Sequence, residues 1–120
     1  SQTDLPFLKS VMEKVLPVTI IIDDGSHISK DVITTFKFLF PKLRKGGWYV
    51  VEDIQTSYWQ VFEGDPKDLA NPRTSMNFFK QLTDSVNSSE FERDDGSDGT
   101  FDHQIDSIHF YYNMVLIKKK

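Results

Sequence analysis

Short apolar runs alternate with amphipathic stretches along this chain. The run VTIIID at residues 18–23 is continuous and rich in β-branched side chains, which predicts a strand buried on both faces of a parallel sheet. Apolar residues recur at helical spacing just before it, at Leu5, Leu8, Val11, Met12 and Val15. Because Pro17 cannot continue a helix, the pattern predicts a helix that ends before the strand begins.

A second amphipathic stretch follows residue 27. Its apolar positions trace one face of a helix and are Ile28, Val32, Ile33, Phe36, Leu39, Phe40 and Leu43. We expect Pro41 to kink the last turn, and Gly46 and Gly47 to end the helix. The run WYVVE at residues 48–52 then predicts another buried strand. A strand, a helix and a strand joined by short connections form a right-handed βαβ unit, so the two strands should be parallel.

The second half of the chain has a different pattern. A loop at residues 64–73 precedes a predicted helix over residues 74–86, and the polar, acidic stretch 88–103 is expected to be a mobile loop. The β-rich runs on either side of Tyr112 and Asn113 predict an antiparallel hairpin. We therefore expect a single α/β domain over residues 1–120.

Composition narrows the classes of function. The net charge of -4 and the pI of about 5.2 argue against a general nucleic-acid binder, because basic residues cluster only at the last three positions. The absence of cysteine excludes disulfide scaffolds and thiolate zinc sites. No apolar stretch approaches the roughly 20 residues that span a bilayer. These features predict a soluble, cytoplasmic protein without nucleic-acid or membrane partners.

Acidic residues follow both predicted strands of the βαβ unit. Asp23 and Asp24 end the first strand, and Glu52 and Asp53 end the second. Ligands of open α/β sheets bind outside the carboxyl ends of the strands, and neighbouring strands lie about 4.8 Å apart, so these carboxylates should converge. Hard oxygen ligands favour Mg²⁺, Mn²⁺ or Ca²⁺.

His27 follows Asp24 by three residues and could accept a proton near neutral pH. A metal ion that lowers the pKa of a bound hydroxyl, beside such a base, would create an oxygen nucleophile. However, the sequence DDGS fits an ordinary strand-to-helix turn equally well, and an isolated Glu52–Asp53 pair is more typical of a solvated turn. The presence of acidic residues at the ends of two consecutive strands favours a metal site over these alternatives.

Two motifs carry a resemblance to a known family. IIIDDGSH at residues 20–27 and GGWYVVEDIQTSYW at residues 46–59 resemble the macrolide-sugar O-methyltransferases related to the macrocin and mycinamicin enzymes, and cephalosporin hydroxylase-like proteins share the pattern. The resemblance implies a three-layer, Rossmann-like methyltransferase sheet with S-adenosylmethionine as cofactor. It also implies that Asp24, Glu52 and Asp53 hold Mg²⁺ and that His27 is the general base.

The resemblance assigns roles to further residues. The segment SQTD at residues 1–4 resembles the one whose acidic residue meets the adenine of the cofactor, which assigns Asp4 to cofactor binding, as it does Asp23. The glycine-rich cofactor loop of the family has no counterpart here, so we expect a C-terminal part of the domain that binds the cofactor poorly alone. Tyr58 and Trp59 are candidate substrate contacts, although aromatic loop residues pack on a core as often.

The predicted function is methyl transfer from S-adenosylmethionine to a hydroxyl of a sugar or polyketide glycoside in antibiotic biosynthesis. A cephalosporin hydroxylase-like secondary-metabolite enzyme and a truncated, non-catalytic domain are the alternatives. The sequence leaves open the small-molecule acceptor and the oligomeric state, including a homo-oligomer.

Overall fold

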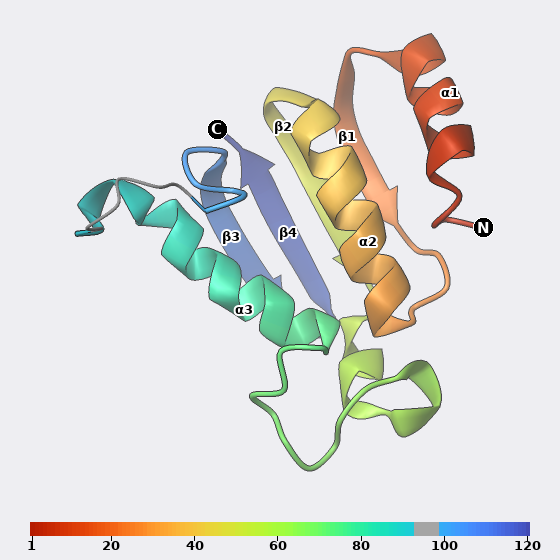
Figure 1. Cartoon of the computed structure of the whole chain (residues 1–120), viewed down its shortest axis with the longest axis vertical. Coiled ribbons are helices and arrows are strands. Elements are labelled where there is room, and N and C mark those ends of the chain that lie inside the picture. The colour runs from red at the N-terminus through yellow and green to blue at the C-terminus, as the bar shows by residue number, and fades with distance from the viewer. Residues whose placement is uncertain (93–98) are drawn as a thin grey trace.

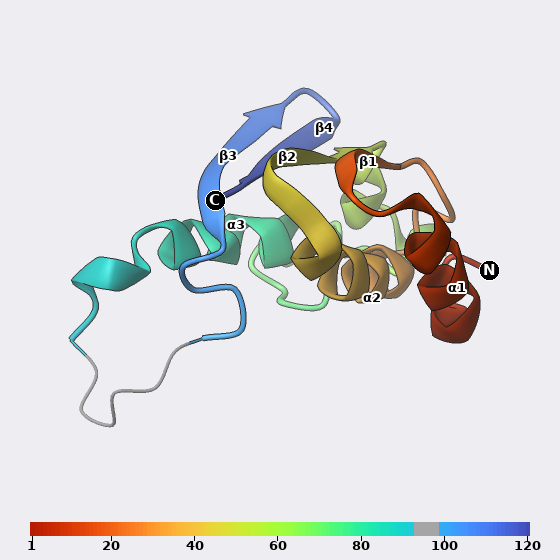
Figure 2. The ribbon, with the colours of Figure 1, turned by 90° about the horizontal axis from the view of Figure 1, so that it is seen from above.

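A four-stranded mixed sheet with helices packed on one face makes up the computed structural model, which describes residues 1–92 and 99–120 (Figures 1 and 2). The strands are β1 (Val18–Asp23), β2 (Leu43–Glu52), β3 (Ile105–Tyr111) and β4 (Met114–Lys119). They lie in the order β1-β2-β4-β3, with β1 parallel to β2 and the other pairs antiparallel. The predicted βαβ unit and terminal hairpin are therefore confirmed.

The α-helices of the described residues all cover the same face of the sheet (Figure 2). They are α1 (Leu5–Val15), α2 (Ser29–Leu39) and α3 (Ser75–Val86). Asp4 and Thr74 begin α1 and α3 by accepting hydrogen bonds from backbone N–H groups of the first turn, which would otherwise lack partners. None of the helices in residues 1–92 and 99–120 is long and apolar enough to cross a membrane.

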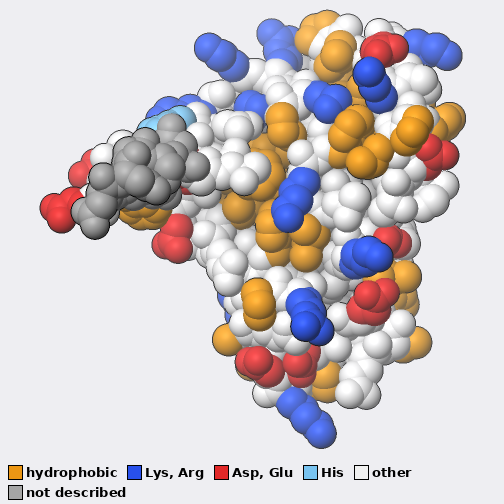
Figure 3. Space-filling view, in the orientation of Figure 1, with side chains coloured by type: hydrophobic (Ala, Val, Ile, Leu, Met, Phe, Trp, Pro, Cys, Tyr) orange, Lys and Arg blue, Asp and Glu red, His pale blue; other side chains and the backbone are white. Residues whose placement is uncertain are grey.

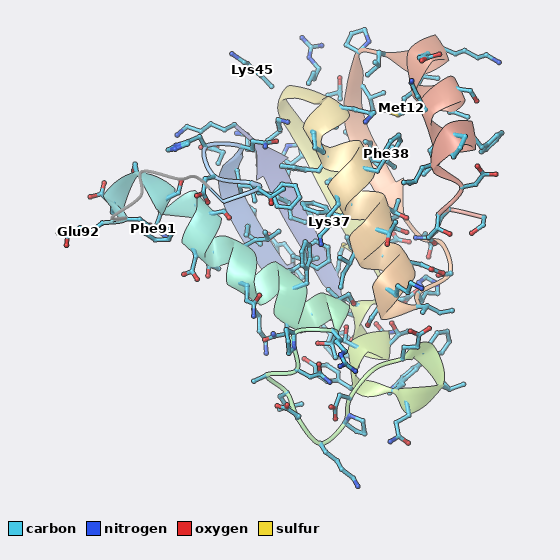
Figure 4. The ribbon with its side chains drawn as sticks, in the orientation of Figure 1. Met12, Lys37, Phe38, Lys45, Phe91 and Glu92 are labelled. Atoms are coloured by element: carbon cyan, nitrogen blue, oxygen red, sulfur yellow. The ribbon has the colours of Figure 1, made fainter. Side chains whose placement is uncertain are left out.

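Aromatic rings fill the space between the sheet, α2 and α3. Phe36 of α2 is fully buried, and its centroid lies 4.8 to 5.8 Å from those of five other rings: Phe40, Tyr49, Phe78, Phe79 and Phe101. Such edge-to-face and tilted packing adds to the hydrophobic gain from burial. Figure 4 shows Met12 on α1 and Phe38 on α2 in the space between these helices, so α1 joins the same core.

Phe101 shows that the expected loop at residues 88–103 is only partly right. Its side chain is 4% exposed and packs on Phe36 and Phe40, and Ser88–Glu90 form a 3-10 turn. Because most of the stretch is polar, its composition did not indicate that Phe101 would be buried. Residues 93–98, the middle of the expected loop, lie outside the described residues.

Strand β1 is not buried on both faces, contrary to the prediction. Ile20 is 56% exposed and Ile22 is 60% exposed, whereas Asp23 is buried on the side of the helices. β1 is an edge strand, and no described element covers the face of the sheet opposite the helices (Figure 2). Of the three layers expected, the described residues therefore form two.

Gly46 and Gly47 do not end a helix, contrary to the prediction. Helical structure ends in a 3-10 turn at Phe40–Lys42, where Pro41 lies, and both glycines belong to β2. A Cβ on Gly47 would lie 2.7 Å from the carbonyl oxygen of Thr19 and 2.9 Å from that of Arg44. Glycine at this position therefore allows β1 to approach β2 closely.

The variant Gly47→Ala is expected to lower the free energy of unfolding by about 2 kcal/mol, because backbone atoms must shift to admit the methyl group. Unfolding in urea measures the effect. Gly46→Asn is the matched control, since no atom lies within 4 Å of the Cβ position of Gly46 and asparagine tolerates its φ of +77°. A Gly47→Ala variant as stable as the unmodified chain would show that the close approach is not required.

Charge is distributed unevenly along the sheet. Strand β4 runs antiparallel to β2 and pairs Lys118 with Trp48, so the C-terminal lysines lie at the same edge of the sheet as the start of β2, which carries Arg44 and Lys45. Figure 3 shows Lys and Arg side chains gathered along this upper edge of the molecule. The acidic strand ends lie at the opposite edge.

Candidate metal and base site

The acidic ends of β1 and β2 lie side by side. Asp23 pairs with Val51 across the parallel strands, so the next residues along the chain, Asp24 and Glu52, are neighbours at the carboxyl edge of the sheet. Asp53 follows directly. The expected convergence is therefore present for Asp24, Glu52 and Asp53, whereas Asp23 is buried on the side of the helices.

His27 lies close to two of these carboxylates. Its Nε2 is 3.6 Å from Oδ1 of Asp24 and 3.7 Å from Oδ2 of Asp53. One possible metal-ligating atom from each of these three residues lies within 4.8 Å of the other two. The side chains of Asp24 and Asp53 are 56% and 50% exposed, so a small ligand can reach them.

The backbone of two site residues has an uncommon conformation. His27 and Asp53 have φ values of 63° and 55°, in the left-handed region that residues with side chains seldom adopt. The Thr56 hydroxyl donates to the His27 carbonyl at 2.7 Å, and the Ile54 N–H donates to the Asn113 carbonyl at 3.1 Å. These contacts hold both turns in place and so preorganise the His27 and Asp53 side chains.

Glu52 shares the negative environment. The charge of Asp24 raises the pKa of Glu52 above its usual value, and partial desolvation, a hydrogen bond with Asp24 and the charge of Asp53 act in the same direction. His27 opposes the shift. A cation among these groups would favour their charged forms, so the crowding of like charges suits a cation site.

Asp23 points toward the helices, away from the exposed cluster. It is 7% exposed and accepts a hydrogen bond from the Gly25 N–H at 3.2 Å. Burial raises the pKa of its carboxyl group, and burial together with the charge of Asp23 raises the pKa of Tyr49. The Tyr49 hydroxyl has no hydrogen-bond partner of normal geometry among the described residues. Both residues line a pocket of about 340 Å³ that also reaches Asp24.

The variant Asp23→Asn is expected to stabilise the chain at neutral pH and to lose that advantage in acid. The raised pKa means that the folded state disfavours the charged carboxylate, so the unmodified chain loses stability as the pH rises above the usual carboxyl range. An asparagine avoids this penalty and can still accept the Gly25 N–H. Thermal unfolding from about pH 4 to about pH 8 measures the difference between the two proteins. A difference that stays constant or grows toward acid would contradict this account.

The remaining predicted residues lie around the cluster. Asp4 is exposed and caps α1, because its Oδ1 accepts the Phe7 N–H at 3.1 Å. Tyr58 and Trp59 follow the Asp53 turn and are 36% and 49% exposed, with the Trp59 ring packed near that of Phe62. Their roles in binding cofactor and substrate stay predictions.

The sequence did not reveal the polar side chains that support the site. The buried Ser57 and Ser75 hydroxyls are 2.7 Å apart, and the Ser75 N–H donates to the Ser29 Oγ at 3.1 Å. In the turn between β1 and α2, Thr56 donates to the His27 carbonyl and Gln2 accepts the Ser26 N–H. These short polar residues carry no periodic signal, and their partners lie 18 to 46 residues away.

Comparison with known proteins gives close relatives, although no family model matches the chain. It is 42% identical over 120 residues to 8-demethyl-8-alpha-L-rhamnosyl tetracenomycin-C 2'-O-methyltransferase of Streptomyces olivaceus. This match covers 99% of this chain and 31% of the relative. It is 40% identical over 119 residues to demethylmacrocin O-methyltransferase of Streptomyces fradiae, covering 98% and 30% of the two. Mycinamicin VI 2''-O-methyltransferase of Micromonospora griseorubida is 40% identical over 121 residues, with the same coverage. The chain therefore spans about a third of the length of these relatives.

Solved structures show the same correspondence. The MycE methyltransferase of mycinamycin biosynthesis, in complex with Mg and SAH, superposes with a TM-score of 0.93 at 38% identity, over 99% of this chain and 31% of that one. Its complex with Mg, SAH and mycinamycin VI superposes with a TM-score of 0.85. The predicted α/β architecture and the resemblance to sugar O-methyltransferases are confirmed.

Proposed function

Because this chain is homologous over nearly its whole length to sugar O-methyltransferases of antibiotic pathways, we propose that it forms the metal-and-base part of such an enzyme. The reaction is methyl transfer from S-adenosylmethionine to a hydroxyl of a glycoside. The observation that carries the proposal is the placement of the His27 Nε2 at 3.6 and 3.7 Å from the Asp24 and Asp53 carboxylates, in a chain with these relatives.

The donor set suits a hard divalent cation. We assign Asp24, Glu52 and Asp53 as the residues that hold Mg²⁺, since carboxylate oxygens are its usual protein ligands. When bound, Mg²⁺ supplies a positive charge that orients the acceptor oxygens and lowers the pKa of the hydroxyl. The related MycE structure contains Mg, which supports this assignment.

His27 takes the proton of the acceptor hydroxyl in this mechanism. The proton moves to Nε2 as the oxygen bonds to the methyl carbon and the bond from that carbon to the cofactor sulfur breaks. Nε2 lies beside the carboxylates and remains partly accessible, with 24% of the side chain exposed. A general base placed in this way contributes about 10² to 10⁴ in rate.

Only part of the cofactor site belongs to this chain in the proposal. We assign Asp4 and Asp23 to cofactor binding and infer that a segment with the glycine-rich loop lies beside β1. Ile20 and Ile22 support this inference, because they form an exposed apolar surface on an edge strand. The chain alone should then bind S-adenosylmethionine much more weakly than a protein that includes such a segment.

A chimera tests the proposed function. This chain would replace the matching segment of the mycinamicin VI 2''-O-methyltransferase, to which it is 40% identical over 121 residues. We expect the chimera to bind S-adenosylmethionine and to methylate mycinamicin VI in a Mg²⁺-dependent reaction detected by product mass. A folded chimera that binds the cofactor and Mg²⁺ but transfers no methyl group to any glycoside offered would contradict the proposal.

A further inference from the structure

Gln2 joins three segments of the molecule at the base of the site. Its side-chain oxygen accepts the backbone N–H of Ser26, and its side-chain amide nitrogen donates to the Thr35 Oγ1 at 2.9 Å. The same nitrogen lies 3.4 Å from both carboxylate oxygens of Asp23. One side chain thus ties the N-terminal segment to the end of β1, to the following turn and to α2.

The surroundings permit one orientation of the Gln2 amide. A flipped amide would place its NH₂ group against the Ser26 N–H and its oxygen against the Asp23 carboxylate, so both contacts would become repulsive. The Thr35 hydroxyl donates in return to the backbone carbonyl of Gln2 at 3.2 Å. Both the oxygen and the nitrogen of the side-chain amide therefore have partners that fit this orientation.

The glycine at position 25 is a second observation that supports a specific role for Gln2, because a side chain at position 25 would occupy the same space. A Cβ on Gly25 would overlap the side-chain oxygen of Gln2 and would lie 2.8 Å from its Cδ. Gln2 is held by its other bonds and cannot move aside without losing them. The glycine of the turn therefore leaves space for this glutamine.

The turn that Gln2 holds carries Asp24 and His27. Ser26, whose N–H it binds, also donates its hydroxyl to Asp31 of α2 at 2.7 Å. The next residue, His27, has a positive φ, and its carbonyl accepts the Thr56 hydroxyl. Gln2 and Thr56 thus hold two consecutive residues of the turn that directs His27 toward Asp53.

We propose that Gln2 is a positioning residue that sets the geometry of Asp24 and His27 through the Ser26 N–H, with Gly25 as its required neighbour. The inference rests on the proposed function, because it concerns the metal-and-base site. It requires no contact between Gln2 and the metal ion or the substrate.

Mn²⁺ binding to the 120-residue chain, followed by electron paramagnetic resonance, tests the proposal. We expect Gln2→Ala to weaken Mn²⁺ binding by about 10-fold, as is typical when a residue that orients metal ligands is removed. Gln81→Ala is the matched control, because Gln81 is exposed on α3, and it should bind Mn²⁺ as the unmodified chain does. Unchanged affinity in Gln2→Ala would overturn the proposal.

A double-mutant cycle with Gly25→Ala separates positioning from general destabilisation. Gly25→Ala should weaken Mn²⁺ binding about 10-fold when Gln2 is present and have little further effect when residue 2 is alanine, because the overlapping atoms are then gone. Additive losses would overturn the proposal, and Gly25→Ala alone still tests it if Gln2→Ala does not fold. Absence of Mn²⁺ binding by the unmodified chain would instead reject the metal site and the proposed function together.

Discussion

Replacing Asp24 with alanine in the chimera is expected to lower the rate of methyl transfer by about 10³-fold. Asp24 lies at the centre of the cluster, next to Glu52 across the strands and 3.6 Å from His27. In the proposed site its loss removes a metal ligand. A bound metal ion contributes several kcal/mol to stabilising a transition state, at about 1.4 kcal/mol for each factor of ten. Single-turnover methylation of mycinamicin VI under saturating S-adenosylmethionine would measure the effect.

Asp84→Ala is the matched control for this change. Asp84 is exposed on α3, away from the acidic cluster. It should leave methyl transfer unchanged. An Asp24→Ala chimera that keeps more than a tenth of the activity, or an unmodified chimera that stays active after Mg²⁺ is chelated, would contradict the assigned metal site.

Replacing His27 with alanine should lower methyl transfer by about 10² to 10⁴-fold while leaving Mn²⁺ binding nearly intact, because a base and a ligand have separable roles. The remaining rate should rise with pH, since hydroxide from solvent can then remove the proton that Nε2 no longer accepts. Rates and Mn²⁺ affinities measured on the same preparations would separate the two roles.

His109→Ala is the control for the loss of a histidine. His109 contacts Trp48 and Ser107 on the sheet and forms no part of the acidic cluster. If His27→Ala lost Mn²⁺ affinity and activity in equal measure, His27 would be a metal ligand and not the base. Because its Nε2 lies 3.6 and 3.7 Å from two carboxylates, His27 is close enough to the proposed ion for either role, and the measurement decides between base and ligand.

The sequence predicted the elements that depend on local periodicity. The β-branched run at residues 18–23 and the terminal hairpin form where expected, and the amphipathic α2 begins where expected although it ends at Leu39, before the predicted end. Parallel pairing of β1 with β2 then follows from the short connections, and it brings Asp24 and Glu52 together without further information.

What the sequence could not predict depends on contacts between distant residues. The exposure of Ile20 and Ile22 depends on which other segments cover the sheet, and an apolar run looks the same whether one face is covered or both. Gly46 and Gly47 suggested a helix end, because the backbone of Thr19, which requires a glycine at position 47, lies far away in the sequence.

The supporting residues of the site were hidden for the same reason. Gln2 and Thr56 each bind the turn between β1 and α2 across more than 20 residues of chain. The positive φ of His27 occurs in the turn that these bonds hold, and such a conformation is not apparent from the spacing of residues in the sequence. Spacing therefore predicted which groups meet at the strand ends, and the structure was needed to identify the residues that orient them.

Anomalous diffraction from crystals of this chain soaked in Mn²⁺ tests the central claim most directly. We predict one strong peak at the carboxyl edge of β1 and β2, about 2.0 to 2.6 Å from carboxylate oxygens of Asp24 and Asp53, with Glu52 as a third ligand. The His27 Nε2 should lie near the ion but outside bonding distance. Crystals with free access to these residues and no peak there, or with the peak at another site, would contradict the account.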